Sequence, residues 1–207
     1  PERLAEVSGI SAEKARELGE AFRQRFGIRQ IMEFFAQHQL PAELAVRVYK
    51  LYGADAVDML YDDPYLLMDD GLDAPFGAVD RFAVELGVAA DDPRRTEAGA
   101  LFEMRFGAAA GHVFVPEEKL VAASAQLLSV ETDTIRQAVA RLLAAERLVR
   151  QTLAGITVLY LPALYAAETT CAARLLAFGK TKFPEPDRLD AMLHRAAQES
   201  DVTYSAQ

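Results

Sequence analysis

The chain is poor in residues that carry covalent or metal chemistry. Its 207 residues include one cysteine, Cys171, and three histidines, His38, His112 and His194. A single cysteine excludes an intrachain disulfide and fits a reducing compartment, so we expect a cytoplasmic protein. The apolar helical context of Cys171 predicts a buried, inert thiol. The spacing of these residues predicts no metal site and no catalytic residues.

Long apolar runs and targeting signals are missing as well. No run approaches the roughly 20 apolar residues that span a bilayer, and the start does not resemble a secretory signal. The sequence opens on Pro1 and ends on a polar stretch, which suggests a piece of a longer protein. We expect no membrane partner.

A phosphate-binding loop is also missing. Gly179-Lys180-Thr181 resembles the end of such a loop, which requires a glycine five residues before the Gly-Lys pair. That position is Arg174, in a run with helical spacing. We therefore expect no enzymatic activity in this chain by itself.

Negative charge is concentrated in one segment. The net charge is −9, of which residues 53–93 contribute −10, with eleven acids against Arg81. Residues 1–52 and 94–162 are each at +1, and residues 163–207 are at −1. A phosphate backbone would be repelled from residues 53–93 and could approach the flanks. The acidic segment is either a solvated face or a docking surface for a partner.

Apolar spacing predicts a mainly α-helical fold. In a first domain, residues 1–93, we expect helices over residues 12–25, 30–37, 42–52, 54–61 and 78–86. The break between the first two is expected at Phe26-Gly27, and Leu44, Val48 and Leu51 should face inward. The alternation suggests degenerate helix-hairpin-helix units, of which only the first keeps its glycine turn.

That first unit is Val7-Ser8-Gly9-Ile10, directly before a helix. Gly9 permits a tight turn, and Ser11 can cap the helix. Backbone N–H groups at such a turn hold a phosphate without reading bases. We therefore expect a DNA-backbone site formed by Gly9, Ile10, Ser11, Lys14 and Arg16. Alternatively, Gly9 serves only to let two helices pack.

Residues 94–162 predict a winged-helix-like domain with one β-hairpin. Helices over residues 97–106 and 117–128 and a third from an N-cap at Ser129 to about residue 145 precede two β-rich runs around Ala154-Gly155. A further short strand is expected near residues 112–114.

The third helix of this domain occupies the position of a recognition helix. It would expose Arg136, Gln137 and Arg141 to DNA, but Glu131 and Asp133 at its start oppose entry into a groove. We expect a packing or strand-guiding domain rather than a sequence reader.

Residues 163–207 form the last expected division. They predict a helix over residues 163–178, a linker and a short helix over residues 188–198. Leu164, Ala167, Cys171 and Leu175 would share one stripe of the longer helix.

Short motifs in a fixed order cover nearly the whole sequence. They are Pro1-Glu2-Arg3-Leu4, the hairpin at residues 7–11, Tyr52-Gly53, Asp63-Pro64-Tyr65-Leu66, Phe76 with Asp80, Ala83, Leu86 and Gly87, Asp92-Pro93-Arg94-Arg95, Gly111-His112 with Pro116 and Leu120, Leu159-Tyr160 and Ala167-Glu168. Together they resemble the amino-terminal region of RecD-like superfamily 1 DNA helicases, the exodeoxyribonuclease V alpha subunit family. One departure is Ser11, where this hairpin usually has a second glycine.

The resemblance implies a motor that uses ATP and Mg²⁺ in the full-length protein and moves 5′→3′ on single-stranded DNA in repair and recombination. It places this region before the motor domains. The ending Thr203-Tyr204-Ser205-Ala206-Gln207 resembles the start of the Q motif, which makes Gln207 the glutamine that contacts adenine.

Two functions are therefore expected of this region. The first is non-catalytic DNA handling without sequence specificity, next to the chain's own motor domains. The alternative is a protein-interaction module that docks a partner or the motor domains through residues 53–93.

Overall fold

A computed structural model describes residues 11–69, 71–72, 74–180 and 189–200. Contacts divide the chain into two units, residues 1–165 and 166–207. One apolar core runs through the first unit, across the boundary expected between residues 93 and 94. The division into residues 1–93, 94–162 and 163–207 stays a prediction.

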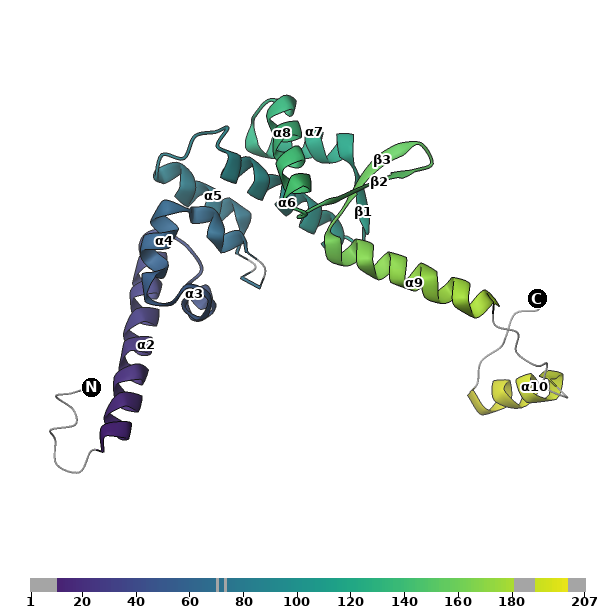
Figure 1. Cartoon of the computed structure of the whole chain (residues 1–207), viewed down its shortest axis with the longest axis horizontal. Coiled ribbons are helices and arrows are strands. Elements are labelled where there is room, and N and C mark those ends of the chain that lie inside the picture. The colour runs from purple at the N-terminus through teal and green to yellow at the C-terminus, as the bar shows by residue number, and fades with distance from the viewer. Residues whose placement is uncertain (1–10, 70, 73, 181–188, 201–207) are drawn as a thin grey trace. The chain divides into compact units, whose positions relative to one another are not determined.

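The described residues are mainly helical, as predicted (Figure 1). The elements, in chain order, are α2 (Ala12–Gln37), η1 (Ala42–Leu44), α3 (Ala45–Tyr52), η2 (Gly53–Asp55), α4 (Ala56–Asp62), η3 (Pro64–Met68), α5 (Phe76–Glu85), α6 (Pro93–Ala109), β1 (Phe114–Pro116), α7 (Glu117–Leu128), α8 (Thr132–Ala144), β2 (Val149–Leu153), β3 (Ile156–Tyr160), α9 (Pro162–Lys180) and α10 (Leu189–Ser200), where η marks a 3₁₀ helix.

Helix α2 is continuous where a break was predicted. Gly27 is buried within it, and a Cβ at this position would overlap the ring of Tyr49 on α3. The glycine therefore permits close packing of the two helices and does not end the first one. Leu51 was also placed wrongly, because its side chain is 55% exposed while Leu44 and Val48 are buried.

Three glycine turns contradict the expectation that only the first hairpin keeps one. Gly53 ends α3 with φ +69°, Gly71 precedes α5 with φ +87°, and Gly87 follows α5 with φ +84°. These positive φ angles are costly for residues with a Cβ. Glycine therefore permits the backbone conformation at these three positions.

Helices α6, α7 and α8 pack against one another beside a three-stranded antiparallel sheet of order β1-β3-β2. The predicted hairpin is confirmed: Val149 pairs with Tyr160, and Ala154 and Gly155 form the turn with φ +48° and +81°. The short strand expected near residues 112–114 lies at Phe114–Pro116 and pairs with β3.

Ser129 is not the N-cap of α8. It ends α7 in the left-handed conformation, with φ +55°, and Glu131 precedes the first residue of α8. The backbone N–H of Val130 donates to the carbonyl of Ala125, which completes a C-terminal cap of α7. A serine between two helices has two possible caps to form, and spacing alone did not distinguish them.

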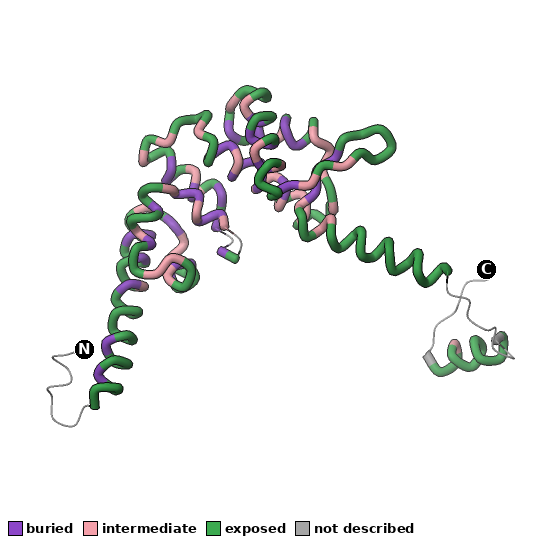
Figure 2. Tube along the Cα trace, viewed as in Figure 1, coloured by how far each residue is buried: buried purple, intermediate pink, exposed green. Residues whose placement is uncertain are grey.

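The core of the first unit combines aliphatic residues with an aromatic cluster. Phe34 of α2 packs edge-on against Phe82 of α5, with ring centroids 5.4 Å apart, and Tyr61 and His38 complete the cluster. Buried positions gather where these helices meet, as Figure 2 shows. Among residues 11–27, which the structure describes, none belongs to this core.

Helix α9 has no buried residue, and the stripe predicted on it is not covered by the described part of the chain. Cys171 is exposed, so the prediction of a buried thiol was wrong. Gly179 and Lys180 lie in the last turn of α9, where the backbone is helical and does not form a phosphate-binding loop.

Candidate nucleic-acid interface

The start of α2 holds the described part of the predicted DNA site. Ser11 is the N-cap, because its hydroxyl accepts a hydrogen bond from the backbone N–H of Lys14 at 3.2 Å. Lys14 and Arg16 are exposed on the first turns. Gly9 and Ile10 lie outside the described residues, as does Gln207, so their assigned roles stay predictions.

A glycine hairpin that the sequence analysis did not single out lies between η3 and α5. Leu72 follows Gly71 and is fully buried, and the Arg47 guanidinium donates to the Gly71 carbonyl at 2.9 Å. Helix α5 then begins after Pro75 without a side-chain cap from the described residues. The signal was present, because Gly71-Leu72 repeats the glycine–apolar order of Gly9-Ile10.

Two of the described acids near this hairpin have structural roles. Asp69 accepts the Tyr52 hydroxyl at 2.7 Å, and Asp63 caps η3 by accepting the N–H of Tyr65. Burial and the hydrogen bond to Asp69 raise the pKa of Tyr52 well above its usual range. Part of the charge of residues 53–93 is therefore committed to holding the fold.

One buried group of polar side chains joins α5, α6 and α7. Asp80 accepts hydrogen bonds from the Tyr65 hydroxyl at 2.7 Å and from the Arg95 guanidinium at 2.8 and 2.9 Å. Arg95 also donates to the carbonyls of Ala90 and Leu128. Burial and the bond to Asp80 raise the pKa of Tyr65, so its hydroxyl stays protonated as a donor. The Arg95 side chain is only 9% exposed and cannot offer its charge to a ligand.

The predicted contacts on α8 are also engaged. Arg136 is exposed and donates to Glu118 at 2.8 Å and to Asp133 at 3.1 Å, and these bonds raise its pKa. Arg141 bonds to Glu97 and to the hydroxyl of Thr96. Both arginines would have to exchange a carboxylate for a phosphate in order to bind DNA.

The β2–β3 hairpin presents apolar residues at its end. Leu153 is 40% exposed and Ile156 is 57% exposed, next to the Ala154-Gly155 turn. Arg150, nearer the base of the hairpin, is paired with Glu117 at 2.8 Å. This end therefore provides little attraction for phosphates.

Positive charge without a carboxylate partner is found on α2. Lys14, Arg16, Arg23 and Arg25 are exposed and form no ion pair with the described residues. Arg29 is paired with Glu33 at 2.8 Å. Of the predicted contacts that the structure describes, those on α2 have the more available charge.

The described ranges contain no candidate metal site and no candidate membrane-spanning helix. There, no group of three or more His, Cys, Asp and Glu residues is placed to hold a metal ion. No helix within those ranges has both the length and the hydropathy to cross a bilayer.

Comparison with known proteins bears on the same helices. Residues 24–114 match the family model described as the ATP-dependent RecD2 DNA helicase HHH domain. Residues 24–114 are therefore similar to the HHH domain of RecD2 helicases. The chain is also 30% identical over 121 residues to the ATP-dependent RecD2 DNA helicase of Deinococcus radiodurans. The predicted resemblance to the amino-terminal region of RecD-like helicases is confirmed.

The limits of this match change the expected position of the hairpins. The match contains the Gly53 and Gly71 turns and ends at β1, whereas Gly9 and Ser11 precede it. The aligned part is 58% of this chain and 17% of the Deinococcus protein. The chain thus corresponds to a small part of the relative's length.

Proposed function

We propose that this chain is the amino-terminal DNA-handling region of an ATP-dependent 5′→3′ DNA helicase, and that it has no catalytic activity of its own. The observation that carries the proposal is the match of residues 24–114 to the RecD2 HHH domain, in a segment that folds into short helices joined by glycine turns. Backbone N–H groups at such turns are suited to phosphates.

The contacts with DNA are to the backbone and do not read sequence. Glu131 precedes α8 and Asp133 lies in its first turn, so base edges would meet carboxylates there. Arg136 and Arg141 are held by acids of the same domain. The exposed cations of α2, which include Lys14 and Arg16, attract the DNA phosphates. Backbone N–H groups of Gly9, Ile10 and Ser11 complete the phosphate site.

Residues 94–162 support this function as a winged-helix-like domain. Their order of helix, strand, two helices and two strands, with a hairpin at the end, is the basis for this assignment.

In the full-length protein, ATP and Mg²⁺ would drive the motor, and Gln207 would contact adenine. The location we propose is the cytoplasm.

A second candidate function rests on the charge of residues 53–93. Asp55, Asp58 and Asp62 are exposed, and they add to the −10 of this segment. Such a surface would dock a basic partner or the chain's own motor domains. Asp63, Asp69, Asp80 and Asp92 are committed to caps and internal bonds, which reduces the charge available for docking.

A salt-series titration of the chain with fluorescent single-stranded and duplex oligonucleotides tests the leading proposal. We expect weak binding, equal for unrelated sequences. The logarithm of the binding constant should fall linearly with the logarithm of salt concentration, with a shallow slope, because only a few phosphates are neutralised. Absence of binding to both DNAs at low salt would contradict the proposal. DNA-stimulated phosphate release from ATP by this chain would contradict its non-catalytic part.

Two substitutions locate the contact. Gly9→Val should weaken DNA binding more than Arg136→Ala if the first hairpin holds the phosphate, because valine disfavours a positive φ. The reverse order would move the site to α8. If neither change affects DNA while a basic partner binds residues 53–93, the docking function is favoured.

A further inference from the structure

An exposed strip lies on α2, on the side opposite the buried residues Gly27, Ile31 and Phe34. Leu18, Phe22, Arg25, Phe26 and Arg29 follow the i, i+4, i+7, i+8, i+11 spacing of one helical face. Phe22 is 70% exposed and Phe26 is 53% exposed. Large aromatic side chains are costly to leave in water, so such a pair marks a binding surface.

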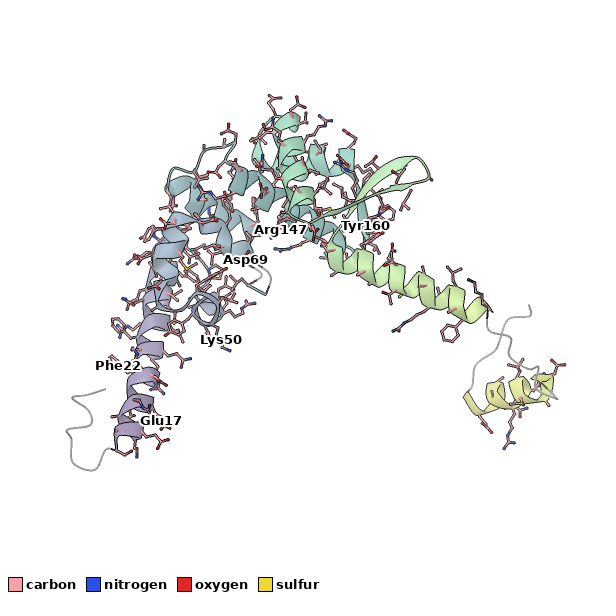
Figure 3. All side chains as sticks on the ribbon, in the orientation of Figure 1. Glu17, Phe22, Lys50, Asp69, Arg147 and Tyr160 are labelled. Carbon is pink, nitrogen blue, oxygen red and sulfur yellow. The ribbon has the colours of Figure 1, made fainter. Side chains whose placement is uncertain are left out.

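The two rings are arranged as flat, accessible surfaces. Their planes differ by 14° and their centroids are 6.3 Å apart. This separation is close to two base steps of about 3.4 Å each along a DNA strand. Figure 3 shows Phe22 extending outward from α2.

The charge around the rings is positive. Residues 21–32 contain Arg23, Arg25 and Arg29 and no acid, in a chain whose net charge is −9. At about 100° per residue, Glu17 and Glu20 point roughly 140–160° away from Phe22. Glu33 lies one turn beyond Arg29 on the same side of the helix and is paired with Arg29 at 2.8 Å.

We propose that Phe22 and Phe26, flanked by Arg23 and Arg25, form a base-stacking platform for single-stranded DNA. Exposed aromatic rings beside backbone-binding cations are the arrangement by which proteins bind single strands without reading sequence. Duplex DNA does not offer its base faces, so the platform prefers a single strand. This inference rests on the proposed DNA-handling function and names the form of DNA that α2 binds.

Affinity for a dT20 oligonucleotide provides the first test. The double variant Phe22→Ala/Phe26→Ala should bind it about tenfold more weakly or worse, with duplex binding unchanged. Phe22→Tyr should retain affinity, whereas Phe22→Leu/Phe26→Leu should lose as much as the alanine pair, because leucine is apolar but not planar. Phe106→Ala is the matched control, since Phe106 is 64% exposed on α6, stacks on Phe102 and follows Arg105, whose guanidinium donates to the Met68 carbonyl.

A spectroscopic test uses the absence of tryptophan from the chain. In Phe22→Trp the new indole is the sole tryptophan, and stacking of bases should quench its fluorescence as dT20 is added. The matched Phe106→Trp variant should show no such quenching. Circular dichroism of each variant should match that of the unmodified chain, because both rings of the platform lie outside the core.

The outcomes separate this inference from the proposed function. Restored affinity in the leucine pair would indicate an apolar docking face for protein and overturn the platform. Unchanged dT20 affinity in the alanine pair, with salt-dependent DNA binding intact, would overturn the platform and leave the proposed function standing. No DNA binding by the unmodified chain would overturn both.

Discussion

Residues 1–52 and residues 94–162 have the same net charge, +1, and each has eight Lys and Arg residues. In the second segment, Arg94, Arg95, Arg136, Arg141 and Arg150 all bond to carboxylates. In the first, Arg29 is paired with Glu33, whereas Lys14, Arg16, Arg23 and Arg25 form no ion pair with the described residues. Net charge sums all cations and anions of a segment, whereas ligand binding depends on which cations are not already paired.

The two sets of arginines therefore perform different work. Arg95 satisfies a partly buried carboxylate and two backbone carbonyls, and so it joins helices. Arg25 lies on an exposed helix face beside aromatic rings, where its charge can meet a phosphate. Removing one of these bonded arginines should cost stability, whereas removing an unpaired cation of α2 should cost ligand affinity.

The largest expected effect comes from the buried pair. Asp80→Ala would leave the Arg95 guanidinium and the Tyr65 hydroxyl without their shared acceptor, and we expect the free energy of unfolding to fall by about 3–5 kcal/mol. Chemical denaturation measures this change. Tyr65→Phe removes only one hydrogen bond and should cost about 1 kcal/mol. A cost below about 1 kcal/mol for Asp80→Ala would show that the pair does not join these helices.

Next in size is the loss of available cations from α2. Arg23→Gln/Arg25→Gln should weaken single-stranded DNA binding about tenfold in roughly 50 mM salt, and the salt slope should fall by about 0.7 for each phosphate that is no longer neutralised. Circular dichroism should show unchanged folding. The control is Arg136→Gln, whose guanidinium is already held by Glu118 and Asp133. An equal loss of affinity in the control would remove the distinction between the two segments.

A smaller effect is expected at the start of α6. Asp92 caps this helix and bonds to Arg94, which holds the pKa of the Asp92 carboxyl below its usual range. Its stabilisation is therefore complete above the unfolded-state pKa of about 4 and is lost as the pH falls further. Asp92→Ala should cost about 1 kcal/mol at neutral pH and less at a pH of about 3. Asp92→Asn keeps a capping oxygen and should show a weaker pH dependence.

The smallest effect tests whether a paired arginine can be released. Glu118→Gln removes the 2.8 Å carboxylate partner of Arg136 and should raise DNA affinity about twofold in low salt. Glu43→Gln, at an exposed acid, controls for the general change in net charge. A gain equal to that of the control would mean that Arg136 does not contact DNA even when it is released.

The spacing of apolar residues predicted the helices and the hairpin, because a helix or strand with one buried face repeats its apolar residues at a characteristic interval. Helix α7 and the Ala154-Gly155 turn lie at the predicted positions. The break at Gly27 was wrong because a glycine ends a helix in one context and admits a neighbouring ring in another. Only the position of Tyr49, 22 residues along the chain, decides between the two.

The candidate site was less predictable, because it depends on pairs that are distant in sequence. The sequence placed Arg141 on the exposed side of its helix, but Glu97 comes from another helix and engages it. Phe22 follows Ala15 and Gly19 at helical spacing, yet those two residues are buried while Phe22 is 70% exposed. Spacing identifies the apolar side of a helix and does not say whether anything covers it.

The continuity of α2 through Gly27 has a mechanical consequence. Residues 28–37 pack in the core. Residues 12–26 extend the helix beyond the core by about 22 Å, at about 1.5 Å per residue. Glycine is the most compliant residue of a helical backbone, and here it lies where the anchored part begins. A force on residues 12–26 would therefore bend α2 at Gly27, and contact with the ring of Tyr49 would limit the bend on one side.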